Sequence, residues 1–357
     1  MKKVMFVIGQ MSNGGAERVV SVLANSLCDQ YDISVVCPIK DELVYELDTR
    51  VQYFGNNISI HNNIKRKIQH YQFIHKCYNK IIPDIVISFT TEINIYCCIY
   101  KIFHNIPRLI ISERNDPKRD PKSKGKRIAR KCLYWIADKC VFQTQYAMEC
   151  FSKAVQHKGT VIFNPVSSEL PYSEVNEREK KIVSISRLQK QKNIPLMINA
   201  FERFHQLYEE YVLEIYGDGS EKSNIEGLIA ERNLEDCVKL MGFCKDVHDR
   251  IKSASMFLLT SNYEGMSNAM IEALCMGIPT ICTDCPAYSA REFIKDGENG
   301  YLIDVGDLDQ LISKMILLEN NKDLSAQFSE NTKRLRQVLS TDVISRKWKE
   351  IIEDEKN

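Results

Sequence analysis

The sequence predicts two α/β domains in tandem, each a doubly wound, Rossmann-like parallel sheet with helices on both faces. Apolar runs of five to seven residues alternate with longer segments of helical periodicity along most of the chain. The alternation stops near residues 165–179, where the chain is polar and contains two prolines, and it starts again at residue 181. A chain of 357 residues is also too long for one hydrophobic core, which favours two domains.

The first domain is expected to span residues 1–165, with a strand at residues 2–9 and a helix at residues 15–28. Later apolar runs predict its other strands at residues 33–37, 84–89, 108–112, 139–143 and 160–164. Short strands that are apolar throughout are typical of a parallel sheet buried on both faces.

A linker is predicted at residues 166–179, followed by a second domain at residues 180–338. Its strands are expected at residues 181–186, 211–217, 237–242, 255–261, 279–284 and 300–305. The remaining residues, 339–357, predict a C-terminal helix that can cross back to the first domain.

The composition, 44% hydrophobic and 27% charged with a net charge of +1, is that of a soluble globular protein. Residues 1–178 hold 25 Lys and Arg against 17 Asp and Glu, which gives them a net charge of +8 and leaves −7 for the rest. This split indicates an anionic surface partner for the first domain. No run is apolar enough for a membrane span, so we expect a cytoplasmic protein.

The 13 cysteines have no regular spacing and indicate small buried residues in a reducing compartment. The CxxC pair Cys282 and Cys285 lacks a second pair or a histidine partner, and no metal or cofactor is expected.

Two cations follow the first strand of the second domain, at the sheet edge where doubly wound folds bind ligands. Arg187 can hold a diphosphate with two hydrogen bonds and Lys192 can add a point charge. Gly217 ends the next strand at the same edge. A solvated basic turn is the alternative interpretation.

Two acids, Glu264 and Glu272, lie beside a predicted helix at residues 267–277. Ser267 or Asn268 can cap this helix, whose N-terminal N–H groups can bind a phosphate. The two carboxylates can accept hydrogen bonds from hydroxyls, Glu272 from a ribose and Glu264 from a sugar. This arrangement fits a nucleotide sugar. The alternative is that both acids only favour the helix dipole.

The segments "RLQKQKN", "YGDG" and "SNYEGMSNAMIEALCMGIPTICTD", in this order, resemble the C-terminal half of glycosyltransferase family 4 enzymes. "GGAER" after the first strand and "FNPV" at residues 163–166 also resemble that family, in its bacterial surface-polysaccharide subgroup. The resemblance implies a GT-B fold, with two domains facing a cleft, and retaining, metal-independent transfer from a sugar nucleotide.

By this resemblance, Arg187, Lys192 and Glu264 form the catalytic set, in which the two cations bind the donor diphosphate and Glu264 binds the donor sugar. Gly14 and Gly15 would let a loop of the first domain close on donor and acceptor. The implied donor-binding positions are Gly14, Gly15, Arg187, Lys192, Gly217, Glu264, Gly265, Met266, Ser267, Asn268 and Glu272.

Two positions depart from the family pattern. Ser186 replaces the usual glycine before the arginine. A histidine that many members carry near the reacting centre is replaced by the segment Glu113, Arg114 and Asn115. These three residues are acceptor-side candidates, although Glu113 could equally belong to a structural ion pair.

A basic segment at residues 117–131 contains eight Lys and Arg against one acid. We interpret it as a surface that docks on the anionic inner leaflet of the cell membrane, assisted by a basic helix at residues 63–80. A solvated charged face is the alternative, and nucleic acid is not an expected partner.

The sequence therefore predicts a retaining glycosyltransferase at the inner face of the membrane. It would transfer a hexose or N-acetylhexosamine from a UDP-sugar to a lipid-diphosphate-linked saccharide in surface-polysaccharide synthesis. Two alternatives remain: an epimerase or hydrolase of sugar nucleotides on the same fold, and a noncatalytic sugar-nucleotide-binding partner.

Overall fold

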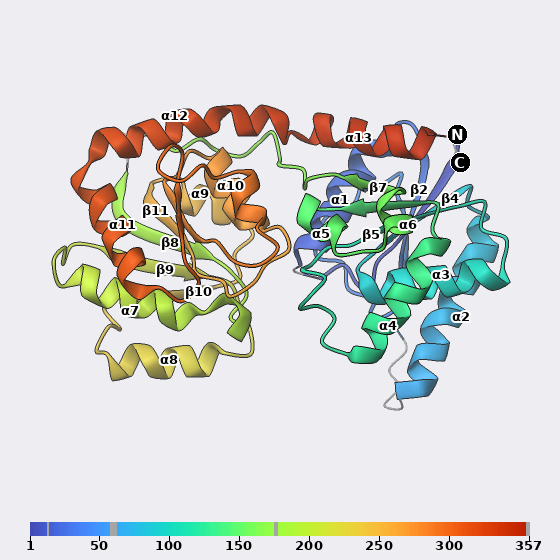
Figure 1. Cartoon of the computed structure of the whole chain (residues 1–357), viewed down its shortest axis with the longest axis horizontal. Coiled ribbons are helices and arrows are strands. Elements are labelled where there is room, and N and C mark those ends of the chain that lie inside the picture. The colour runs from blue at the N-terminus through green and yellow to red at the C-terminus, as the bar shows by residue number, and fades with distance from the viewer. Residues whose placement is uncertain (13, 58–62, 175–177, 355–357) are drawn as a thin grey trace. The chain divides into compact units, whose positions relative to one another are not determined.

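The computed structural model describes residues 1–12, 14–57, 63–174 and 178–354, and the chain divides into two compact units. The first unit comprises Met1–Pro165 and Thr341–Asn357, and the second comprises Val166–Ser340. Each unit contains one sheet, and the strand pairs within the described residues are all parallel (Figure 1). The predicted fold class is confirmed.

The first unit has a seven-stranded sheet in the order β3-β2-β1-β4-β5-β6-β7. Its strands are β1 (Lys3–Val7), β2 (Asp32–Cys37), β3 (Gln52–Gly55), β4 (Ile85–Phe89), β5 (Arg108–Ser112), β6 (Lys139–Phe142) and β7 (Gly159–Val161). The sequence did not predict β3, because this four-residue edge strand is only half-buried and lacks a continuous apolar run.

Helices cover both faces of the first sheet (Figure 1). They are α1 (Gly15–Leu27), α2 (Asn63–Ile81), α3 (Thr91–Phe103), α4 (Lys124–Leu133), α5 (Gln145–Glu149), α6 (Lys153–Gln156) and α13 (Thr341–Glu353), with a 3-10 turn η1 at Tyr134–Ile136. Helix α1 packs against α13, whereas α3 lies between α2 and α4 and supplies much of the core.

The second unit has a six-stranded sheet in the order β10-β9-β8-β11-β12-β13. Its strands are β8 (Glu179–Ile185), β9 (Val212–Tyr216), β10 (Val238–Gly242), β11 (Ala254–Leu259), β12 (Thr280–Thr283) and β13 (Tyr301–Ile303). Its helices are α7 (Ile194–His205), α8 (Lys222–Glu231), α9 (Val247–Ile251), α10 (Asn268–Cys275), α11 (Leu308–Asn320) and α12 (Lys322–Val338), with 3-10 turns η3 (Lys190–Lys192) and η4 (Ser289–Glu292).

The described residues of the predicted linker, 166–174, 178 and 179, belong to the second unit, and Glu179 already begins β8. The Tyr172 hydroxyl donates to the Ser329 carbonyl at 3.1 Å, and Arg178 donates to the Ser325 hydroxyl at 2.6 Å. These contacts fasten the segment to α12. The rest of the predicted linker, residues 175–177, lies outside the described part of the chain.

Both sheets reverse their strand order at one point, between β1 and β4 in the first and between β8 and β11 in the second. In doubly wound folds, the place outside the carboxyl ends of two such strands is the crevice where ligands bind. Each unit thus has one preferred place for a ligand, set by its topology.

Helix α13 completes the core of the first unit through Trp348, which is fully buried. Its ring lies 5.7 Å from that of Phe89 at the end of β4, and the Arg114 guanidinium lies 5.7 Å from the same tryptophan ring. A helix that follows the second unit in sequence is therefore part of the structure of the first.

We predict that Trp348→Ala lowers the free energy of unfolding of the first unit by about 3–5 kcal/mol, because it opens a cavity beside Phe89. Urea unfolding followed by circular dichroism measures the change. Trp135→Ala is the matched control, since Trp135 is 58% exposed. An equal loss of stability in both variants would contradict the role given to Trp348.

Candidate functional site

The candidate site of the second unit lies at the crevice between β8 and β11. Strand β8 leads into the turn that carries Arg187 and Lys192, and β11 leads into the loop that carries Glu264. Because β8 and β11 are parallel neighbours, both segments leave the sheet at its carboxyl edge. The topology thus brings together residues that are more than 70 positions apart in the sequence.

Hydrogen bonds join the two loops directly. The Gln191 amide donates to the Tyr263 carbonyl at 2.8 Å, and the Asn262 amide donates to the Lys190 carbonyl at 3.1 Å. The Thr260 hydroxyl donates to the Lys192 carbonyl at 3.0 Å. Polar side chains that bond to backbone carbonyls fix both loops, so the residues they carry have defined positions before any ligand binds.

Lys192 and Glu264 form an ion pair at this crevice, with Nζ 2.5 Å from Oε1. Their side chains are only 11% and 10% exposed. The Ser261 hydroxyl donates to the same oxygen, Oε1, at 2.5 Å. No described residue donates to Oε2 of Glu264, which leaves this oxygen to accept a hydrogen bond from a ligand.

Arg187 lies on the same turn as Lys192 but is exposed, and its guanidinium forms no ion pair with any described residue. Gly217, at the end of β9, packs against this turn at φ +133°, and a Cβ there would lie 2.1 Å from the Ser186 carbonyl oxygen. Glycine is therefore required by the neighbouring backbone, which accounts for Gly217 without a ligand.

Helix α10 begins at the same crevice, with Ser267 as its N-cap residue. The Ser267 hydroxyl accepts a hydrogen bond from the Met270 N–H at 3.4 Å. The helix ends before Gly277, whose φ of +78° favours glycine at this position. Gly265, Met266 and Asn268 surround the start of the helix, at the positive end of its dipole.

Glu272, in the second turn of α10, faces a different partner from Glu264. Its Oε2 lies 2.8 Å from Nε2 of His248 in α9, and its side chain is 6% exposed. Sequence reasoning did not single out His248. The available signal was its position on a short helix just after a strand of the same sheet, β10.

Gly14 and Gly15 lie at the start of α1, just beyond the carboxyl end of β1, where Gly14 is the N-cap residue. An ideal Cβ on Gly14 would lie 1.9 Å from Oε2 of Glu17. The carboxylate of Glu17 therefore already lies over the helix N-terminus. Asn13 lies outside the described residues.

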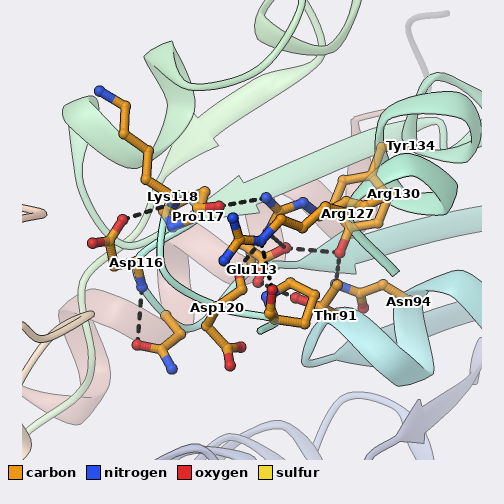
Figure 2. Close-up of polar contacts among 12 residues, drawn as sticks. Thr91, Asn94, Glu113, Asp116, Pro117, Lys118, Asp120, Arg127, Arg130 and Tyr134 are labelled. Atoms are coloured by element: carbon orange, nitrogen blue, oxygen red, sulfur yellow. Dashed lines mark hydrogen bonds and ion pairs between the residues drawn. The ribbon is translucent and has the colours of Figure 1, made fainter. Parts of the chain in front are cut away.

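Glu113 follows β5 and is enclosed by donors from three elements (Figure 2). The Thr91 hydroxyl donates to Oε1 at 2.7 Å, the Tyr134 hydroxyl donates to Oε2 at 2.8 Å, and Nη1 of Arg130 lies 3.7 Å from Oε2. Burial raises the pKa of Glu113 and the positive charge of Arg130 opposes this shift. Both carboxylate oxygens have partners within the first unit.

Arg130 connects this network to the loop that precedes α4 (Figure 2). Its guanidinium donates to the carbonyls of Pro117 at 2.5 Å and Asp120 at 2.9 Å. Arg130 is buried, and so it is one member of the basic segment 117–131 that is not available to a partner. The remaining basic residues of the segment keep their charges at or near the surface.

The Arg114 guanidinium contacts the rings of both Phe89 and Trp348, at 5.0 and 5.7 Å from their centroids, and burial lowers its pKa to about 9. Its Nη1 donates to Oδ1 of Asn164 at 2.8 Å. Its Nε and Nη2 are buried and have no hydrogen-bond partner among the described residues. The Asn115 side chain accepts a bond from the N–H of Asp116 and so shapes the loop.

The described residues contain no cluster of three or more His, Cys, Asp or Glu with the geometry of a metal site. Cys282 and Cys285 are buried free thiols with raised pKa values, caused mainly by desolvation. Within the described part of the chain, no helix combines the length and apolarity that crossing a membrane requires.

Residues 169–335 match the family model described as "Glycosyl transferases group 1". Over its whole length the chain is 26% identical to an α-1,4-N-acetyl-D-galactosaminyltransferase of Campylobacter jejuni, whose name gives a diNAcBac-PP-undecaprenol acceptor; the match covers all of both chains. It is 24% identical to the amylovoran biosynthesis glycosyltransferase AmsD of Erwinia amylovora, over 99% of this chain and 100% of AmsD.

Among solved structures, HepE of Anabaena in complex with UDP and glucose has a TM-score of 0.81 at 18% identity, and covers 99% of this chain and 100% of its own. The sucrose-phosphate synthase of Thermosynechococcus elongatus has a TM-score of 0.84 at 16% identity, with 99% and 98% covered. The fold is that of GT-B glycosyltransferases, and the family match within the second unit and the full-length relatives support a glycosyltransferase.

Proposed function

We propose that the protein is a retaining glycosyltransferase that takes a hexose or N-acetylhexosamine from a UDP-sugar. The acceptor is a lipid-diphosphate-linked saccharide, and the product belongs to a surface polysaccharide. The relatives from C. jejuni and E. amylovora support this acceptor class by their names, and the UDP complex of HepE supports the donor class. The finer assignment to family 4 is part of the same proposal.

The observation that carries the proposal is the ion pair of Glu264 with Lys192, a residue of the turn that also carries Arg187. Transfer breaks the bond between the anomeric carbon of the sugar and the diphosphate, and the leaving diphosphate gains negative charge. We assign Lys192, Arg187 and the N-terminus of α10 to the stabilisation of that charge. Oε2 of Glu264, which no described residue bonds, accepts from a hydroxyl of the donor sugar.

On the acceptor side we assign different roles to two neighbouring residues. Glu113 is structural, because Thr91 and Tyr134 already occupy both of its oxygens. Arg114 keeps two buried N–H-bearing nitrogens without a partner among the described residues, which favours it as the residue that contacts a polar group of the acceptor.

The proposal also places the first unit on the inner face of the cell membrane. Lys118, Arg119, Lys122, Lys124 and Lys131 are exposed along the loop before α4 and along the helix itself. Ile128, on the same helix, is 63% exposed, and Trp135 just after it is 58% exposed. Basic residues beside exposed apolar side chains suit an anionic lipid surface.

Donor chemistry is tested with purified protein, a panel of nucleotide sugars and a lipid-diphosphate-linked saccharide acceptor. Thermal stabilisation selects the donor, because binding raises apparent stability with affinity. We expect UDP release only with acceptor present, and an anomeric configuration in the product equal to that in the donor. Turnover without acceptor would instead indicate a hydrolase or epimerase, and donor binding without transfer would indicate a noncatalytic partner.

We predict that Arg187→Ala lowers turnover by about 10²–10³-fold, because the loss of one donor to transition-state charge costs about 3–4 kcal/mol. Arg187 is exposed, so the variant should keep the wild-type melting temperature. Lys190→Ala, on the same turn, is the matched control. Turnover of Arg187→Ala at the level of this control would refute a diphosphate role for Arg187.

Glu113→Gln should lower the free energy of unfolding by about 3–5 kcal/mol, because buried Arg130 loses its carboxylate partner. Urea unfolding measures this change. Glu92→Gln is the control, because Glu92 and Lys126 form a half-exposed ion pair worth less than about 1 kcal/mol. A Glu113→Gln variant with wild-type stability and abolished transfer would show that Glu113 is catalytic instead.

We predict that the triple variant Lys122→Glu, Lys124→Glu, Lys131→Glu binds vesicles of phosphatidylglycerol at least about 100-fold more weakly, since each basic residue near such a surface contributes about 1 kcal/mol. Vesicle sedimentation measures binding. The control reverses three exposed lysines of the second unit, Lys239, Lys252 and Lys295. Equal losses in both triple variants would show that docking does not use α4.

A further inference from the structure

His248 contacts one of the two acids of the candidate site and has no assigned role. Its Nε2 lies 2.8 Å from Oε2 of Glu272. The two residues come from successive crossovers of the same sheet: α9 follows β10, and α10 follows β11. The side chain of Glu272 is 6% exposed and that of His248 is 19% exposed, so the histidine is the member of the pair nearer to solvent.

The chemistry of the pair fixes the direction of the hydrogen bond. An ionised carboxylate can only accept hydrogen bonds, so Nε2 of His248 carries the hydrogen and donates the hydrogen bond to Glu272. The χ3 torsion of a glutamate has a broad distribution, so the carboxylate plane can rotate. A hydrogen bond from a ring carried by a different helix, α9, restricts this rotation.

We propose that His248 is a positioning residue, which orients the Glu272 carboxylate to accept hydrogen bonds from the 2′- and 3′-hydroxyls of the donor's ribose. This inference rests on the proposed function, since it requires a ribonucleoside diphosphate at the crevice between β8 and β11. His248 acts through Glu272 and selects a ribonucleotide over a nucleotide that lacks these hydroxyls.

The fold of α9 does not depend on His248. The helix is anchored by Val247 and Ile251, which are 9% and 0% exposed. Arg250 on the same helix is exposed and pairs only with Asp246 among the described residues. Substitution of His248 should therefore leave α9 folded, and Arg250→Ala is a matched control on the same helix.

The experiment measures the affinities of UDP and of 2′,3′-dideoxy-UDP by calorimetric titration. The proteins are the wild type, His248→Ala, His248→Gln, Glu272→Gln and Arg250→Ala, each first checked by circular dichroism. We expect His248→Ala to weaken UDP binding about tenfold, in the range of one hydrogen bond to a charged group, and to leave dideoxy-UDP binding unchanged. His248→Gln should restore most of the loss, because its amide N–H can donate at a similar reach.

Combining His248→Ala with Glu272→Gln should weaken UDP binding no further than Glu272→Gln alone, since both changes remove the same contact. A merely structural histidine would instead weaken both nucleotides alike, and that result overturns the inference. Equal failure of His248→Gln and His248→Ala also overturns it, because the donated bond would then not be what matters.

The same titrations separate the inference from the proposed function. If Glu272→Gln weakens UDP binding selectively but His248→Ala does not, the nucleotide site stands and only the role of His248 is wrong. If the wild type binds neither nucleotide, the proposed function fails, and the inference fails with it.

Discussion

The ion pair between Lys192 and Glu264 is the interaction on which the site of the second unit depends. Both side chains are nearly buried, so each charge needs the other, and removal of one would leave an uncompensated charge in the crevice. The surrounding hydrogen bonds from Gln191, Asn262 and Thr260 keep the two loops together. A donor would therefore meet a cation and an acid whose positions are already set, with little ordering left to be done on binding.

The sequence predicted the elements whose signals are local. Strands such as β1 and β11 contain continuous apolar runs, and the predicted ends of both lie within two residues of the observed ends. Strand β3 was missed because Tyr53 and Phe54 alone do not make such a run. The segment that ends in Arg178 was predicted to be a linker because it is polar. In the structure Arg178 bonds to α12 and to the Gly277 carbonyl, and composition cannot reveal such contacts.

The site was predictable in part for a related reason. Residues that follow neighbouring parallel strands must meet at one edge, and so the convergence of Lys192 and Glu264 could be expected from topology. The topology does not predict which groups form pairs around the site. The partners of Glu113 and Glu272 are Thr91, Tyr134 and His248, at least 21 positions away in the sequence, and only the packing of specific helices selects them.

Two buried acids, Glu113 and Glu264, differ in how much of their hydrogen-bonding capacity the protein itself uses. Both oxygens of Glu113 accept hydrogen bonds from hydroxyl groups, and an arginine lies near one of them. Most of its hydrogen-bonding capacity is therefore used in contacts that join α3, η1 and α4. Glu264 receives two donors on one oxygen, Oε1, whereas no residue in the described part of the chain donates to Oε2. A carboxylate that is held firmly at one oxygen and left open at the other suits the recognition of a hydroxyl, because it is oriented without being saturated. This difference, rather than burial or sequence spacing, separates the acid that supports the fold from the acid that we propose binds a sugar.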